Sequence, residues 1–234
     1  MDLQGIKLTW LGHATFKIET PAGHTVIIDP WVNGNPSTPA DMKKFESVDA
    51  LLCTHGHFDH IGDAVELAKQ HDSIVVGGFE LCKWMERKGV KRIAPMGIGG
   101  SQMVLDMNVT MVQAQHSCGI QDGDQLIYGG LASGFVVQFE NGLKIYHAGD
   151  TGVFGDMRLI HELYHPDIAM LPIGDHFTMG PRAAAYACEL LRPKSVVPMH
   201  FGTFPALTGT PAEFKKQAAD VGVEVVEMYP GQTL

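Results

Sequence analysis

The chain has 234 residues, of which 45% are hydrophobic, and a formal net charge of −9. This length supports one sizeable core, so we predict a single domain over residues 1–234, and no apolar run approaches the roughly 18 residues that a membrane-spanning helix needs. The acidic balance, without any run of Lys or Arg, argues against a nucleic-acid groove, and the N-terminus lacks the basic start of an export signal, which predicts a cytoplasmic protein.

A hairpin is the first predicted element. Residues 14–19 alternate polar and apolar side chains, a turn with a glycine follows, and residues 25–29 form an apolar strand that stops at Asp29. Such alternation beside a glycine-containing turn is typical of a β-hairpin. The same arrangement returns at residues 133–150, which also end on an aspartate, Asp150. The chain therefore contains a weak internal repeat.

A histidine-rich segment follows the first hairpin. Residues 48–53 read as a short buried strand and residues 63–70 have the apolar spacing of a helix, so we place the segment between them on a strand-to-helix loop. This segment holds four side chains of the metal-ligand type, which are His55, His57, Asp59 and His60. Imidazole and carboxylate groups this close together indicate a metal site at the carboxyl end of a strand. A compositional histidine tract would not come with such a strand and helix frame.

Further strands end close to other candidate ligands. Residues 109–115 precede His116, and residues 195–199 precede His200. The segment 119–130 is rich in glycine, and it is either a loop that covers the pocket or a solvent loop with a turn.

Helices close the second half of the chain. A strand over residues 167–173 leads to a loop that bears His176, and Pro181 opens a helix that continues over residues 183–191. A last helix begins after Thr210 with the pattern of a capping box. Two related halves with helices outside predict an α/β (α+β) fold arranged as a four-layer αββα sandwich.

The order of the candidate ligands resembles that of the metallo-β-lactamase-fold hydrolases, and this resemblance covers essentially the whole chain. The order is His-x-His-x-Asp-His, then His116, then Asp150, then His200. Finer motifs look like those of the compact metal-dependent hydrolases related to L-ascorbate 6-phosphate lactonase. These motifs are Trp-Leu-Gly-His-Ala at residues 10–14, Ile-Asp-Pro at 28–30, Gly-Asp-Thr at 149–151 and the stretch from Pro172 to Pro181.

The resemblance implies a site for two divalent metal ions. It assigns His55, His57 and His116 to one metal, and Asp59, His60 and His200 to the second. Asp150 would bridge the two. Zinc is our first choice because imidazole and carboxylate ligands suit it, although the same ligands accept Mn, Fe, Ni or Co.

A metal-dependent hydrolase is the activity that this resemblance implies. A metal-bridging hydroxide would attack a small ester, lactone or similar acyl substrate. Hydrolysis of a phosphodiester, as in a phospholipase-like enzyme, is the alternative, since the same site serves phosphorus. A non-catalytic metal-binding protein is an alternative of another class. We expect a small-molecule substrate as the partner, and a homo-oligomer is suspected.

Other polar residues receive supporting roles. Asp59 would orient the nucleophile as well as bind metal, and His176 would donate a proton to the leaving group or bind substrate. Asp29 would fix the tautomer of a ligand histidine from outside the ligand set, and His13 could do either job. The remaining histidines are expected on the surface or on helices: His24, His71, His147, His161 and His165. Phe177, Met179, Phe201 and Phe204 either line an apolar wall of the site or pack in the core.

Overall fold

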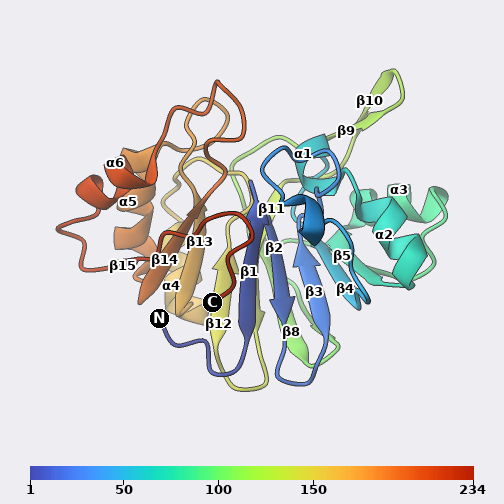
Figure 1. Cartoon of the computed structure of the whole chain (residues 1–234), viewed down its shortest axis with the longest axis horizontal. Helices are drawn as coiled ribbons and strands as arrows, with labels where there is room; N and C mark the ends of the chain where they lie inside the picture. Colours follow the sequence, from blue (N-terminus) through green and yellow to red (C-terminus); the bar gives the residue numbers. More distant parts are fainter.

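The computed structural model covers residues 1–234 and places two sheets face to face, with helices on both outer sides (Figure 1). The strands of the first sheet follow their order in the chain: β1 (Lys7–Gly12), β2 (Thr15–Glu19), β3 (Thr25–Ile28), β4 (Ala50–Cys53), β5 (Ile74–Gly78) and β6 (Ile93–Met96). The second sheet has the order β15 (Glu224–Val225), β14 (Ser195–Met199), β13 (Ile168–Pro172), β12 (Lys144–His147), β11 (Ser133–Gln138), β8 (Met107–Gln113) and β7 (Ser101–Val104). The predicted αββα sandwich is confirmed.

Six α-helices and one short 3₁₀-helix complete the fold. They are α1 (Phe58–Ile61), α2 (Ala64–His71), α3 (Phe79–Arg87), α4 (Met157–Tyr164), α5 (Pro181–Leu191) and α6 (Pro211–Gln217), with the 3₁₀-helix at Ala40–Met42. Helices α2 and α3 pack on the first sheet, whereas α5 packs on the second sheet and is flanked by α4 and α6. No helix is long and apolar enough to cross a membrane.

The internal repeat corresponds to matching strand connections in the two sheets. Strand β2 pairs antiparallel with β3, which is followed by the parallel strands β4 and β5. In the second sheet β11 pairs antiparallel with β12, which is followed by the parallel strands β13 and β14. Parallel neighbours end at the same edge of a sheet, so the loops after β3, β4, β12, β13 and β14 can meet in one crevice.

The inner strands are almost wholly apolar because both of their faces are buried. On adjacent parallel strands, Ile28 and Leu52 belong to the large core that reaches the second sheet, whereas Ile27 and Leu51 belong to a smaller core beneath α2 and α3. A strand with one face in water would have alternated with polar residues at these positions.

The glycine-rich segment 119–130 contains the expected turn, but it is a regular hairpin and not an irregular loop. It forms a β-hairpin of β9 (Gly119–Asp122) and β10 (Gln125–Tyr128), which projects from the body of the molecule. Its turn contains Gly123 in the left-handed backbone region, with φ of 60°. Four paired positions hold the two strands together, from Gln125 opposite Asp122 to Tyr128 opposite Gly119.

The C-terminal segment closes the outer edge of the first sheet. Leu234 exchanges two backbone hydrogen bonds with Leu8, and Trp10 N–H donates to the carbonyl of Gln232. Strand β1 therefore has partners on both sides, which removes an unpaired edge that could associate with other chains.

Candidate metal centre

The histidine-rich segment is partly helical. His55 stands in the link after β4, His57 is the N-cap residue of α1, and Asp59 and His60 lie within that single turn of helix. The backbone N–H groups of His60 and Ile61 donate to the His57 carbonyl at 3.0 and 3.1 Å. The predicted loop is therefore wrong for Asp59 and His60. Helix α1 turns both side chains toward the same crevice, from positions that are adjacent in the sequence.

A first group of imidazoles gathers around His57. Its Nδ1 atom lies 3.0 Å from His55 Nε2 and 3.2 Å from His116 Nε2. Two nitrogen ligands of a tetrahedral zinc ion, each bound at about 2.0–2.1 Å, are about 3.3 Å apart. The three nitrogens therefore have the spacing of ligands on one face of a metal ion.

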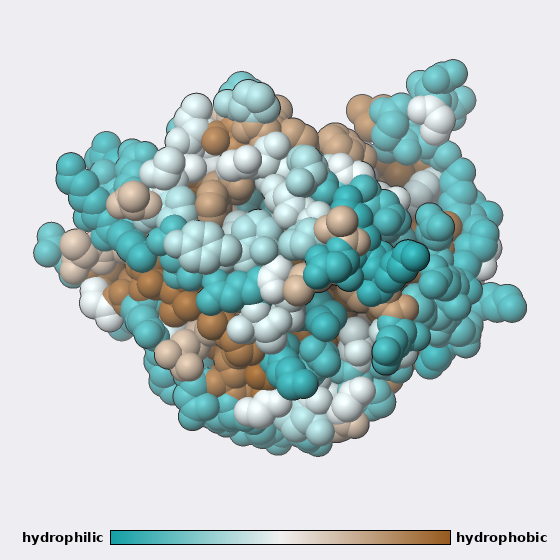
Figure 2. All heavy atoms as spheres, viewed as in Figure 1, coloured by the Kyte–Doolittle hydropathy of each residue, from teal (hydrophilic) through white to brown (hydrophobic).

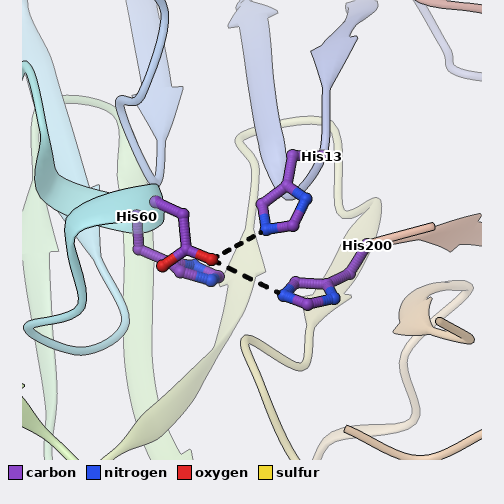
Figure 3. A group of neighbouring side chains, drawn as sticks. His13, His60 and His200 are labelled. Atoms are coloured by element: carbon purple, nitrogen blue, oxygen red, sulfur yellow. Dashed lines mark hydrogen bonds and ion pairs between the residues drawn. The ribbon is translucent and has the colours of Figure 1, made fainter. Parts of the chain in front are cut away.

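A second group surrounds the Asp59 carboxylate (Figure 3). Its Oδ2 atom lies 3.1 Å from His13 Nε2 and 4.0 Å from His200 Nε2, and His60 lies beside them. These side chains come from the turn after β1, from α1 and from the end of β14. His13 also belongs to this group, although the sequence analysis had placed it outside the set of metal ligands.

Asp150 lies between the two groups. Its carboxylate oxygens are 3.0 Å from His200 Nε2 and 3.3 Å from His60 Nε2, on the side of the second group. They are also 3.6 Å from His116 Nε2 and 4.0 Å from His55 Nε2, on the side of the first group. One carboxylate therefore reaches both sets of imidazoles.

Asp29 holds two of the histidines from behind. Its Oδ2 atom is 2.7 Å from His60 Nδ1 and also accepts the Thr54 hydroxyl at 2.8 Å. The Thr54 oxygen in turn lies 3.0 Å from His55 Nδ1. With a metal ion bound, a proton on each Nδ1 would leave each Nε2 with its lone pair toward the ion. Thr54 was missed by the sequence analysis, although its position directly before His55 is a usable signal.

His13 is tied at both ring nitrogens. Nδ1 lies 3.0 Å from the Thr203 hydroxyl oxygen, and Nε2 lies 3.1 Å from Asp59 Oδ2. The ring is fully buried, packed at 3.9 Å from the His200 ring and at 5.3 Å from Trp31. His13, Asp29 and His200 all adopt left-handed backbone angles, with φ between 49° and 55°. Such strain in residues other than glycine is typical of functional sites.

The electrostatic environment keeps the first group neutral. Burial lowers the pKa of the His55, His57 and His116 imidazoles below its ordinary value. Burial also lowers the pKa of His13 to about 4. Neutral imidazoles retain the lone pair that a metal ion needs.

The carboxylates stay ionised and hold a proton on His60. Burial alone would raise the pKa of Asp150, but the His200 and His60 imidazoles outweigh it and hold that pKa well below its usual value. Burial opposes the same outcome at Asp59, where the hydrogen bond with His13 and the nearby His60 charge lower the pKa to about 2. Burial alone would lower the pKa of His60, yet the Asp150 and Asp29 carboxylates raise it well above the ordinary value.

The donor set fits divalent metal ions. His60 Nε2, Asp150 Oδ1 and His200 Nε2 are buried without a well-aligned hydrogen bond, although Asp150 oxygens lie 3.3 Å from His60 Nε2 and 3.0 Å from His200 Nε2. Buried polar atoms normally find partners, because leaving them unpaired costs free energy. These three atoms face one crevice beside an ionised carboxylate, and a divalent cation would give them the partner that they lack.

A cavity of about 500 Å³ opens above the two groups. Its floor contains His57, Asp59, His116, Asp150 and His200. The remaining lining residues are Phe58, Ser117, Gly119, Gln121, Leu126, Phe177 and Phe204. The sequence analysis left open whether four apolar residues line the site or pack in the core. Phe177 and Phe204 line the cavity, whereas Met179 and Phe201 pack in the core.

The structure places His176 outside the lining of this cavity. Asp175 and His176 both adopt left-handed angles, and the His176 side chain is exposed beside Phe177, which lines the cavity instead. The role of His176 stays a prediction. His147 was expected on the surface or on a helix, which is wrong. It is fully buried on β12, with Nε2 2.9 Å from the Ala14 carbonyl.

Comparison with known proteins identifies the family of this chain. Residues 24–201 match the family model described as a beta-lactamase superfamily domain. A UPF0173 metal-dependent hydrolase of Koribacter versatilis is 60% identical over 233 residues, which cover 100% of this chain and 99% of the relative. Another, from Methanopyrus kandleri, is 44% identical and covers 97% of this chain and 99% of the relative.

Solved structures give the same result. The metallo hydrolase Igni18 from Ignicoccus hospitalis aligns with a TM-score of 0.87 at 35% identity, covering 98% of this chain and 97% of that one. The metallo-beta-lactamase fold protein YhfI from Bacillus subtilis aligns with a TM-score of 0.73 at 13% identity over 98% of each chain, and shows the fold alone. The chain therefore belongs to the UPF0173 metal-dependent hydrolases of the metallo-β-lactamase superfamily.

Proposed function

We propose that this metal-dependent hydrolase holds two divalent ions, with zinc as the first choice, and hydrolyses a small ester, lactone or similar acyl compound. The observation that carries the dinuclear proposal is the position of Asp150. Its carboxylate lies within 4.0 Å of a ring nitrogen from each of His55, His116, His60 and His200. A carboxylate between two groups of imidazoles is the arrangement that a bridging ligand requires.

Three sets of residues would hold the ions. His55, His57 and His116 would hold the first ion, Asp59, His60 and His200 the second, and Asp150 would bind both. Bound there, the ions supply an activated water as nucleophile and a Lewis acid for the substrate oxygen. His13 adds a fourth side chain to the second group, through its contact with Asp59.

Asp59 is the residue we propose to orient the attacking water. Its Oδ2 atom is fixed by His13, while Oδ1 makes no hydrogen bond within the chain and the residue lines the cavity. With a pKa of about 2, the carboxylate accepts hydrogen bonds throughout the neutral range. An ionised acceptor at a fixed position aligns a water molecule for attack.

Metal content tests the dinuclear part of this proposal. Zinc-loaded wild type should contain about two equivalents of zinc, and Asp150→Ala should lose metal and activity together while remaining folded. Asp220→Ala, on the exposed surface after α6, is the matched control and should change neither. Two full equivalents of zinc in Asp150→Ala would contradict the assignment.

A substrate panel tests the reaction. Zinc-loaded protein should hydrolyse aryl esters and lactones faster than bis-p-nitrophenyl phosphate. Fast phosphodiester hydrolysis with inert esters and lactones would replace the proposal with a phosphodiesterase. An inert panel, combined with unfolding on chelation, would indicate a metal-stabilised protein without catalysis.

A further inference from the structure

The outer wall of the cavity is built from apolar side chains that folding alone would have buried. Phe58 is 59% exposed, Leu126 is 73% exposed and Phe177 is 56% exposed. They come from α1, from β10 and from the loop after β13, yet all three line the same cavity, together with Phe204. Exposed apolar residues that converge from separate segments indicate a binding surface, in contrast to single apolar residues scattered over the surface.

Aromatic packing holds one side of this wall in place. Trp31 is nearly buried, and its ring lies edge-on to Phe58 at 5.8 Å and stacked on Phe204 at the same distance. The Phe58 and Phe204 rings are 6.4 Å apart. Rings fixed in this way lose little freedom when they contact a ligand, so the wall is organised before binding.

The projecting hairpin supplies the other side. Leu126 lies on β10, and a Cβ atom added to Gly119 on β9 would lie 2.8 Å from Leu126 Cδ1. Gly119 therefore leaves the space that the Leu126 side chain occupies. Figure 2 shows hydrophobic residues on this hairpin among polar ones, at the upper right of the molecule.

No lysine or arginine lines the cavity. The polar groups above its floor are those of Ser117 and Gln121, which are neutral. Metal ions on the floor would attract an anion, but only at the point where the reacting group binds. A second anionic group on the same molecule would lie against Phe58, Leu126 and Phe177, where it would lose part of its hydration without gaining a cation, so a neutral group is favoured there.

From this wall we infer that the natural substrate carries a neutral alkyl or aryl group on the side remote from the reacting carbonyl, and no phosphate, sulfonate or carboxylate there. The acyl part of this inference rests on the proposed function. Phe58, Leu126, Phe177 and Phe204 are then the residues that determine specificity. The volume of about 500 Å³ fits a small molecule rather than a polymer.

A matched pair of esters tests the inference on zinc-loaded protein. Phenyl butyrate and its ring-sulfonated analogue share the scissile bond, and the sulfonate makes the phenol a better leaving group. We expect kcat/KM to favour the neutral ester by about tenfold or more, against this intrinsic reactivity. Leu126→Lys, which places a cation in the wall, should reduce the preference about tenfold or reverse it. Leu163→Lys on α4, where the side chain is 67% exposed and away from the cavity, should leave it unchanged.

Equilibrium binding separates this inference from the proposed reaction. Calorimetry would compare butyranilide and its ring-sulfonated analogue, whose amide bonds resist hydrolysis, on the same zinc-loaded proteins. Preferential binding of butyranilide that Leu126→Lys abolishes would support the inference even if no ester were hydrolysed, and the acyl hydrolase proposal alone would then fail. Equal binding or equal hydrolysis of the neutral and sulfonated compounds, or binding of neither anilide, would overturn the inference.

Discussion

Asp29 Oδ2 lies 2.7 Å from His60 Nδ1, and the same oxygen accepts the Thr54 hydroxyl that contacts His55. One buried carboxylate therefore orients an imidazole in each of the two proposed ligand sets. The sequence analysis placed Asp29 at the end of an apolar strand. In the structure this position lets the carboxylate reach both Thr54 and His60. The two proposed ion sites share a single supporting residue.

Replacing Asp29 should weaken both ion sites. We expect Asp29→Asn to lower zinc affinity by about 10- to 100-fold, because the amide is uncharged and its NH2 group cannot accept the Thr54 N–H that Asp29 Oδ1 accepts at 2.8 Å. Thr54→Val removes the hydroxyl that joins Asp29 to His55 but keeps the contact of Asp29 with His60, so the loss of zinc affinity should be smaller and confined to one equivalent of zinc. Competition with a chromogenic chelator measures the zinc affinity of both variants. Unchanged affinity in Asp29→Asn would contradict this role.

Removal of His57 should separate metal binding from folding. Its side chain is partly exposed and its Nδ1 atom lies between His55 and His116, so His57→Ala removes a proposed ligand without opening the buried core. We expect the variant to retain the far-UV circular dichroism of wild type, to lose zinc and to lose activity. His24→Ala, at a partly exposed histidine on the turn before β3, is the matched control. A fully metallated His57→Ala variant would remove His57 from the ligand set.

The metal-free protein should lose stability in mildly acid solution because of His13. The unfolded chain binds a proton at the ordinary pKa of 6.5, whereas burial lowers the pKa of folded His13 to about 4. The contribution is complete above pH 6.5 and is lost as the pH falls toward 4, by about 3 kcal/mol in total. Urea unfolding of wild type and His13→Gln measures it. The wild-type free energy of unfolding should fall more steeply across this interval, and parallel pH profiles would refute the prediction.

Zinc uptake should release protons. The Asp150 and Asp29 carboxylates outweigh burial and raise the pKa of His60 well above its ordinary value, so the metal-free site keeps a proton where the metal would bind. We expect release of at least about one proton per chain at pH 7, from His60 and from the activated water, and a zinc affinity that falls as the pH is lowered. Calorimetry in buffers of different ionisation enthalpy counts the protons. A heat of binding that does not depend on the buffer would contradict this expectation.

A close backbone approach near His200 gives a further test. A Cβ atom added to Gly174 would overlap the His200 carbonyl oxygen, so the chain after β13 must carry glycine there. Gly174→Ala should lower the free energy of unfolding by about 2 kcal/mol or more and displace His200, which weakens zinc binding. Gly155→Ala meets no atom within 4 Å and should change neither quantity. Wild-type stability in Gly174→Ala would show that the backbone adjusts without cost.

The regular part of the fold could be predicted because local patterns determine it. Strands such as Ala50–Cys53 are buried on both faces and appear as apolar runs, and helix α6 begins at the capping residue Thr210, whose side chain accepts the Glu213 N–H. Helix α1 could not be predicted in this way. It is one turn long, which is too short for an apolar stripe, and Asp59 and His60 face the crevice while Ile61 packs in the smaller core.

Only part of the candidate site could be predicted from the sequence, for a similar reason. Residues that the motif orders, such as His116 and Asp150, come together, whereas Leu126 reaches the cavity through the tertiary position of a hairpin. The internal repeat directed attention to His176, but consecutive left-handed residues place Phe177 at the cavity instead. The hydrophobic periodicity of a sequence does not predict the direction in which the side chains of a loop point.

The β9–β10 hairpin separates the chemistry of this enzyme from its choice of substrate. Its strands pair with each other and belong to neither main sheet, while the floor of the cavity is built on the two sheets and α1. Mutations at its exposed positions, such as Leu126, can therefore accumulate without disturbing the ligand set, whereas Ile120 is buried against Gly56, between His55 and His57. Paralogues that share the same metal-binding residues could therefore differ in substrate through this hairpin alone. The hairpin is the segment to exchange when a new specificity is engineered.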